Sequence, residues 1–444
     1  MQRVSRAGRP LKLGAGGGAG VRATGGGAAG VDARRGTSAV DTRVVGGYSA
    51  TSSSATATLT LRDGVSVVAL DATVEKGTVY VGGVTDVTAA RPNVTSSGPI
   101  DGSGRPAYTS NKGPGPASVT SNAFKVSGCG QNGGDADDRA ASHGGLGYAA
   151  TTECVYGSTF EPTTMGSGGH GTRGGAAVKL TADELVFDGT ISVDGAKGNG
   201  ASHQRWSGAA AGSVWIDAKV LRGATGSVSA DGGARSHDGR GGGGGGRVAL
   251  YCNESHFAGT GSHGWWLPTM QAFGGIGASD DFDGSCGTVY VDCGVVSNTL
   301  LIDNNDRDAT PMVTTLVDHG MSSYSFDEVR ITGQAQLGFD PTGISTSVVT
   351  VSVGAASGDE TGKILARASD AARTSRVVLV MSAAPQGAPF VFDSHYQSSS
   401  GRAVSGSMYD VNWSRRYYLS GAMLLSRYHV YVGAGSALVS PARL

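Results

Sequence analysis

The sequence has few charged residues and no long apolar run. Asp, Glu, Lys and Arg make up 16% of its 444 residues, and the net charge is −1, whereas folded domains average about 25% charged residues. This balance argues against nucleic acid as the main partner, because phosphate binding needs a basic excess. No stretch of 18 consecutive apolar residues occurs, so we expect no membrane-spanning segment.

The motifs of several common sites are also missing. The sequence has no CxxC pair, no GxxxxGK[ST] loop and no GxSxG motif. These absences argue against a zinc ribbon, a P-loop nucleotide site and the nucleophile elbow of α/β-hydrolases. We therefore expect no cofactor, with calcium as the one ion considered below.

Glycine is abundant. It accounts for 75 residues, about 17% of the chain, more than twice its average share of roughly 7%. Glycine weakens helices, and no window longer than about 12 residues has a clean helical apolar period. Two short exceptions lie at 182–187 and 365–376. These features predict an all-β protein with short strands between glycine-rich turns.

An internal repeat indicates the architecture. The alternating segment 177–182 recurs 36 residues later at 213–218, and the segment 189–195 recurs 37 residues later at 226–232. One face of each strand is apolar and cannot be buried by that strand alone, so successive units must stack. We predict a right-handed parallel β-helix, a β-solenoid, over residues 51–310. Segments of related form are 77–81, 99–104, 246–251 and 287–292.

The predicted β-helix has a different composition on either side. Residues 1–50 are rich in Gly, Ala and Arg, and we expect a disordered N-terminal segment. Residues 311–444 read as a divergent, irregular β segment that caps the last coil. The long glycine-rich loops either project from the coils or lie flat as extended segments, and the hexaglycine 241–246 needs tight backbone packing or mobility. These loops are 128–147, 166–175, 195–212, 232–246 and 274–287.

The five cysteines leave one thiol over if disulfides form. In an oxidising compartment, Cys129 with Cys154 and Cys286 with Cys293 would close short loops. The alternative is that the cysteines are small buried apolar side chains. The sequons at Asn93, Asn253 and Asn412 permit a secreted protein without establishing one.

A series of glycine-rich and alternating blocks follows in order at 141–145, 156–158, 166–169, 174–180, 188–195, 212–216, 229–233, 241–251 and 284–304, with the next strand at 324–331. In this order the blocks resemble the glycine-rich repeat region of very large surface and secreted proteins of bacteria, algae, choanoflagellates and plants. The resemblance covers residues 90–340 and implies a β-helix-like, extracellular, structural or adhesive role without catalytic residues. The first residues of the sequence lack the apolar core of a secretion signal, so we expect the sequence to be a fragment or an incomplete gene product.

Two sets of residues are candidate binding sites. The carboxylates of Asp303, Asp306 and Asp308 are oxygen ligands of the kind that holds calcium, although aspartates are also common in solvated turns. Trp265 and Trp266 would suit stacking on sugars if exposed. The alternative is that the segment 257–268 packs against a coil.

The remaining polar clusters offer weaker chemistry. Serine–histidine pairs recur in the glycine-rich loops, and their histidines would form a metal site or a pH-sensitive face if the loops align; the alternative is local hydrogen bonding. These pairs lie at 142–143, 202–203, 236–237, 255–256 and 262–263. A polysaccharide enzyme would need paired carboxylates beside a basic group. Its candidates are Asp194, Asp217 and Asp231, with Lys179, Lys219 or Arg247.

The sequence thus favours a non-enzymatic structural or adhesive β-solenoid, located outside the cell or on its surface. Its partners would be polysaccharides or other components of the surface or matrix. The alternative is a carbohydrate-active β-helix enzyme, a polysaccharide lyase or hydrolase.

Overall fold

The computed structural model describes most of residues 78–366 and, outside this range, only short strands. The gaps are 106–139, 149–153, 170, 199–206, 236–240, 262–263, 279–281, 310–313, 317–320, 340–347 and 360. Within the described residues the protein is all-β and has no α-helix, as the glycine-rich composition predicts.

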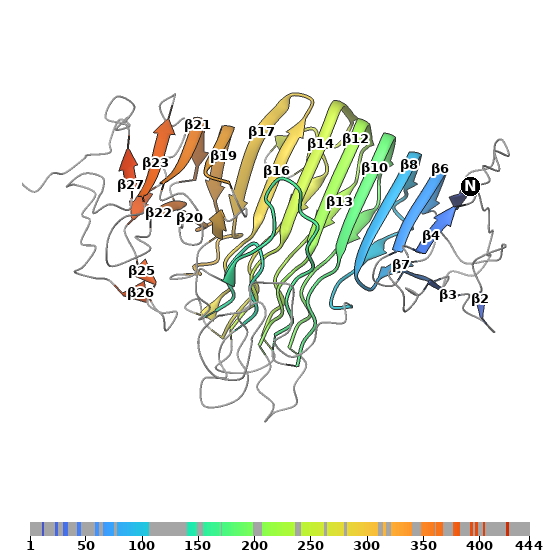
Figure 1. Ribbon diagram of the computed structural model, residues 1–444, viewed down its shortest axis with the longest axis horizontal. Helices are drawn as coiled ribbons and strands as arrows, with labels where there is room; N and C mark the ends of the chain where they lie inside the picture. The colour runs from blue at the N-terminus through green and yellow to red at the C-terminus, as the bar shows by residue number, and fades with distance from the viewer. Residues whose placement is uncertain are drawn as a thin grey trace, which may run out of the picture.

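The largest sheet has 13 strands and extends along the length of the molecule, as Figure 1 shows. Its pairs are parallel except for β16 with β17. The strands are β1 (Leu11–Lys12), β4 (Thr42–Val45), β6 (Val65–Val74), β8 (Val84–Val94), β10 (Ala177–Phe187), β12 (Ser213–Gly223), β14 (Arg247–Phe257), β16 (Thr288–Cys293), β17 (Val296–Asp303), β19 (Ser323–Thr332), β21 (Val348–Gly358), β23 (Arg376–Met381) and β27 (Met423–Leu425).

A second sheet of eight strands faces the N-terminal part of the first. It consists of β2 (Ala23–Thr24), β3 (Gly30–Ala33), β5 (Thr58–Leu61), β7 (Thr78–Val81), β9 (Ile100–Asp101), β11 (Thr190–Ser192), β13 (Ser227–Ser229) and β15 (Thr269–Gln271). Two smaller sheets follow. They contain β18 (Thr314–Leu316), β20 (Gln336–Phe339), β22 (Lys363–Ala366) and β24 (Val391–Asp393), and the hairpin β25 (Tyr396–Gln397) with β26 (Ala403–Val404).

From β6 to β16 the chain alternates between the two large sheets, one strand at a time. Alternate residues of each strand point between the sheets, so identical positions of successive strands form buried rows. One row contains Leu180, Ile216 and Leu250, which pair strand to strand and are at most 2% exposed. Ile191 and Val228 pair in the opposite sheet and belong to the same core.

The sequence repeat matches the strand register. Ala177 pairs with Ser213 and Thr190 with Ser227, which gives the predicted offsets of 36 and 37 residues. Segment 77–81, which has the form of the repeated strands, contains β7 of the second sheet. Segment 182–187, one of the two possible exceptions to the lack of a helical period, is part of β10 and is not helical.

The predicted outer segments contribute strands to the same sheets. Residues 1–50 include β1 to β4, and their remaining residues lie outside the described part of the chain. The large sheet continues beyond residue 311 through β19, β21, β23 and β27. Before that point, β17 returns antiparallel to β16, so the strict alternation of the earlier coils ends there.

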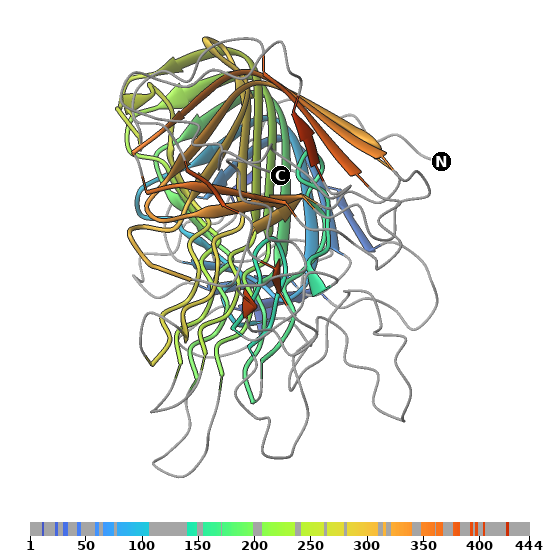
Figure 2. The ribbon, with the colours of Figure 1, turned by 90° about the vertical axis from the view of Figure 1, so that its left-hand side faces the viewer.

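The glycine-rich segments lie flat against one another below the sheets, where Figure 2 shows them descending together in green and yellow. In segment 241–246, backbone amides that are three residues apart donate to the same neighbouring segment. The amides of Gly242 and Gly245 donate to carbonyl oxygens of 282–285, and those of Gly243 and Gly246 donate to carbonyl oxygens of 230–233, all at 2.9 Å. The amide of Gly244 donates to the carbonyl oxygen of Ala141 at 2.8 Å. A three-residue period with lateral hydrogen bonds is the geometry of an extended polyproline-II-like chain, which forms no hydrogen bonds within itself.

We call the packed glycine-rich segments the glycine bundle; it comprises the described residues of 128–147, 166–175, 195–212, 232–246 and 274–287. Its backbones approach one another too closely to leave room for a side chain at the contacts. A Cβ atom at Gly212 would lie 1.7 Å from the carbonyl oxygen of Ala176, and one at Gly208 would lie 1.8 Å from that of Gly233. Of the two alternatives for the hexaglycine, its described residues therefore adopt tight backbone packing.

Candidate functional site

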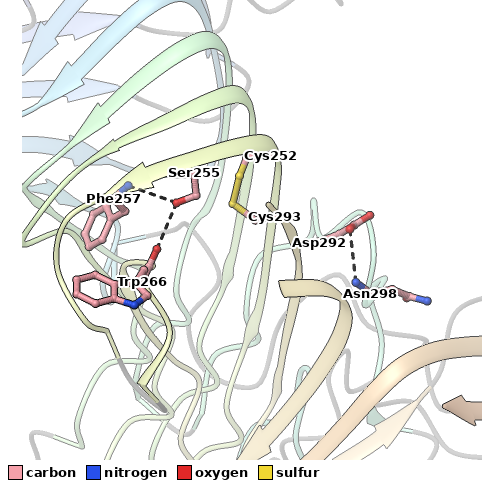
Figure 3. The surroundings of a disulfide bond; sticks show 7 residues. All are labelled: Cys252, Ser255, Phe257, Trp266, Asp292, Cys293 and Asn298. Atoms are coloured by element: carbon pink, nitrogen blue, oxygen red, sulfur yellow. Dashed lines mark hydrogen bonds between the residues drawn. A yellow bond between two sulfur atoms is a disulfide. The ribbon is translucent and has the colours of Figure 1, made fainter. Parts of the chain in front are cut away.

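The two adjacent tryptophans lie in different surroundings at the connection from β14 to β15. Trp265 is half-buried and packs against the hydrophobic core, beside the buried Leu267. Trp266 is 59% exposed, and its carbonyl oxygen accepts a hydrogen bond from Ser255 Oγ at 3.2 Å; Figure 3 shows this corner. Packing against a coil therefore accounts for Trp265, whereas Trp266 is accessible to a ligand.

A disulfide joins Cys252 to Cys293 beside this corner (Figure 3). The two residues pair directly in the register of β14 and β16, so stacking rather than a short loop brings them together. The predicted pairing of Cys286 with Cys293 was wrong: Cys286 is buried with a free thiol, and its Sγ lies 3.1 Å from Thr314 Oγ1. Cys154 is also disulfide-bonded; Cys129 lies outside the described residues.

The three aspartates predicted to bind calcium are not brought together. Asp303 Oδ1 accepts the amide of Asn305 at 2.9 Å, and Asp306 has a positive φ of 58° in the turn that follows. Among the described residues, no group of three or more His, Cys, Asp or Glu side chains is arranged to hold a metal ion. Asp303 is the last residue of β17, and Asp306 lies in the turn that follows it.

Two further clusters of aspartates, at 135–138 and 280–283, are described only in part. The aspartates at 135–138 and 280–281 lie outside the described residues. Asp283 is buried and its Oδ1 accepts the amide of Gly277 at 2.5 Å. This carboxylate therefore supports the glycine-rich backbone.

Asp194 and Asp231 stack on successive coils, two residues beyond β11 and β13. Asp194 Oδ1 accepts the amide of Asp231 at 2.7 Å, and Asp231 Oδ1 accepts the amide of Phe273 at 2.8 Å. Burial, and next the charge of Asp194, raise the pKa of Asp231 to about 6. The pair thus combines a structural role with a carboxyl group that titrates close to neutrality. Asp217, by contrast, is exposed on β12.

The basic candidates are used in different ways. Lys219 forms an exposed ion pair with Asp183 at 2.6 Å. Lys179 Nζ lies 3.4 Å from the ring centroid of Trp215, a cation–π contact. Arg247 is fully buried, and its Nε donates to the carbonyl oxygen of Tyr156 at 2.9 Å. None of these contacts places a basic group beside the aspartate pair.

The histidines that the structure describes do not form a ladder. His143 is buried; its Nδ1 lies 2.8 Å from the carbonyl oxygen of Ala211, and its Nε2 lies 2.8 Å from Thr164 Oγ1. Burial, with Arg247 as the second cause, lowers the pKa of His143 to about 3, so this residue stays neutral at physiological pH. His256 is exposed and lies 3.4 Å from Glu254. The remaining Ser–His pairs, at 202–203, 236–237 and 262–263, lie outside the described residues.

The outer face of the large sheet carries an aromatic cluster that sequence reasoning missed. Phe160, from the segment before β10, lies with its ring centroid 4.9 Å from that of Tyr290. Tyr251 Oη donates to the carbonyl oxygen of Phe160 at 2.8 Å, and Trp215 packs at the margin of the same cluster. The spacing of Trp215, Tyr251 and Tyr290 on outward-facing strand positions was a signal available in the sequence.

Comparisons with protein-family models, curated proteins and solved structures found no match to this chain. Among the residues that the structure describes, no helix is long and apolar enough to cross a membrane.

Proposed function

We propose that this protein is a non-enzymatic β-solenoid, a right-handed parallel β-helix, with a structural or adhesive role outside the cell or on its surface. The alternation of parallel strands between two sheets supports the solenoid. Right-handedness follows from the strong preference of parallel strand crossovers for that hand. The resemblance to glycine-rich repeats of large surface and secreted proteins supports the same role.

The observation that carries the proposal is how the chain uses its polar groups. In the glycine bundle, backbone N–H groups donate hydrogen bonds to carbonyl oxygens of neighbouring segments. Asp194, Asp231 and Arg247 bind backbone groups of other segments. Polar groups that form hydrogen bonds between neighbouring segments stabilise an extended scaffold, whereas a catalytic site needs polar groups that point toward a substrate.

The disulfide supports the extracellular location. Cys252 and Cys293 are bonded on neighbouring strands, and disulfides persist mainly in oxidising compartments. In cells, the proposed location predicts that the protein stays on intact cells and is lost when their surface is treated with protease.

An adhesive role requires a surface for a ligand, and we place it at Trp266. An exposed indole ring offers a flat apolar face on which a sugar ring stacks. The proposed partner is therefore a polysaccharide of a cell surface or matrix. In this proposal the half-buried Trp265 supports its neighbour rather than contacting the sugar.

Polysaccharide binding and cleavage are tested in the same samples. The purified protein is passed over immobilised neutral and acidic polysaccharides, with and without calcium, and new sugar ends are measured. Retention without release, lost in Trp266→Ala, is expected. Ile276→Ala is the matched control, because Ile276 is similarly exposed, at 51%, but lies in the glycine bundle. Equal retention of both variants would refute the assignment to Trp266.

A polysaccharide lyase or hydrolase remains the second candidate, on one observation. Asp231, with a pKa raised to about 6, lies next to Asp194, and a carboxyl group whose pKa is raised by its surroundings is typical of acid–base catalysis. Release of sugar ends that is lost in both Asp194→Asn and Asp231→Asn would favour the enzyme over the scaffold.

A further inference from the structure

The three sequons differ in what the structure allows at their asparagines. Asn253 is exposed on β14. Asn93 is half-buried on β8, where strands pair with it on both sides through Thr73 and Val186. Asn412 lies outside the described residues. A glycan is bulky and needs a surface position, so Asn253 is the described acceptor with room for one.

The pairing of β16 with β14 ends next to Asn253. On one side, β16 pairs with β14 only as far as Cys293, opposite Cys252. The ladder on that side therefore stops one residue before Asn253, and the chain turns away through Gly294, which has a positive φ of 64°. A substituent on the asparagine amide can leave the sheet here without displacing a paired strand.

Two exposed apolar side chains flank this edge. Val295 is 93% exposed and follows Gly294, whose position is fixed beside Ser255: a Cβ atom at Gly294 would lie 3.3 Å from the Ser255 nitrogen. Trp266 is 59% exposed, and Ser255 Oγ donates to its carbonyl oxygen, as Figure 3 shows. The sugar rings of a glycan have apolar faces that would cover Val295, which otherwise remains in contact with water.

We propose that Asn253 carries an N-linked glycan, with Ser255 as the hydroxyl residue of its sequon. The inference rests on the proposed extracellular location, because it requires passage through a compartment that contains the transferase. The disulfide at the adjacent residue, Cys252, is consistent with such a compartment. The proposed glycan is a covalent modification of the chain and is separate from the binding of a free polysaccharide.

The transfer balances as a single substitution. The amide nitrogen of Asn253 attacks C1 of the first sugar of an oligosaccharide linked to a polyprenyl diphosphate. The C1–N bond forms, the C1–O bond to the diphosphate breaks, and the amide nitrogen loses one proton. Because the folded chain engages Ser255 Oγ with the Trp266 carbonyl oxygen, transfer precedes the folding of this corner.

The test uses the full chain, secreted from a eukaryotic host through an added signal sequence. Enzymatic removal of N-glycans is followed by gel mobility and by peptide mass spectrometry, which detects deamidation at Asn253. The expected result is a mobility shift together with deamidation at this position. Both signals at Asn253 should be lost in Asn253→Gln and in Ser255→Ala, and retained in Ser255→Thr, which preserves the sequon.

Asn93→Gln is the matched control and should leave the signal at Asn253 unchanged. Secreted, disulfide-bonded protein without a glycan at Asn253 would overturn this inference while leaving the proposed location intact. A glycan at Asn253 in a protein that is not retained on native cells would support the site and count against the location. Both variants that remove the sequon alter exposed or half-exposed polar groups, so secretion of folded protein serves as the check on folding.

Discussion

The backbone packing of the glycine bundle predicts that a single methyl group will disrupt it. Gly244 lies in the middle of the hexaglycine, and an added Cβ atom would lie 2.0 Å from the carbonyl oxygen of Gly145. Real Cβ atoms essentially never come closer than 3.0 Å, so Gly244→Ala requires the two segments to separate by about 1 Å. Neither segment has a flexible side chain at this contact that could move instead.

The cost follows from packing and from hydrogen bonding. Overpacking of a tight interior costs about 1–3 kcal/mol. Separation also lengthens two lateral hydrogen bonds of Gly244, to Ala141 at 2.8 Å and from Ala211 at 3.1 Å, each with a net value of about 1 kcal/mol. We therefore expect Gly244→Ala to lower the free energy of unfolding by about 3–5 kcal/mol.

Gly264→Ala is the control, since its Cβ atom would meet no atom within 4 Å. This glycine has a positive φ of 78°, so alanine there costs only about 1–2 kcal/mol of backbone strain. Free energies come from urea unfolding monitored by tryptophan fluorescence, with resistance to protease as a second measure. Equal destabilisation by the two variants would refute the close-packed bundle.

Three further predictions concern contacts between stacked strands. Cys252→Ala combined with Cys293→Ala opens a loop with a sequence separation of 41 residues, and should cost about 4 kcal/mol in urea unfolding; an unchanged midpoint would contradict this. The pKa of Asp231 is raised from 3.8 to about 6, so its contribution is complete below pH 4 and is lost as the pH rises through 6. Asp231→Asn should therefore gain stability relative to the wild type between pH 4 and 7, and a constant difference would exclude the raised pKa. Ile216→Ala, at a 1% exposed position, should cost about 2–5 kcal/mol, whereas Ile276→Ala, which is 51% exposed, should cost less than about 1 kcal/mol; similar thermal midpoints would refute the core assignment.

The repeat could be recognised from sequence because stacking uses the same residue types at each coil. Leu180, Ile216 and Leu250 each have apolar residues two positions away on both sides in their own strands, and their spacing equals the length of one repeat. Period and polarity together therefore indicate which residues face the core. Segment 77–81 shows the limit of this pattern, because β7 has the same alternation as the long strands but belongs to the opposite sheet. Alternation marks a buried face without saying which sheet buries it.

The candidate site depended on contacts between coils, which sequence distance conceals. Cys286 is nearer to Cys293 along the chain, yet register places Cys252 directly beside Cys293. Likewise, Asp194 and Asp231 become partners only because two strands of the second sheet align. Each of these pairs was available once the offset of the repeat was applied to every residue, polar ones included.

The glycine bundle shows how composition and function are linked in this chain. Glycine removes side chains from 241–246, and this absence lets carbonyl oxygens approach to within about 2 Å of where a Cβ atom would stand. The same absence leaves the segment 241–246 without nucleophiles or titratable groups, so this backbone joins neighbouring segments but supplies no side-chain chemistry. In the proposed adhesive role, ligand contacts come from corners where side chains return, and Trp266 and Asn253 lie at one such corner. A scaffold that presents binding groups at its edge follows from this division more directly than an enzyme does.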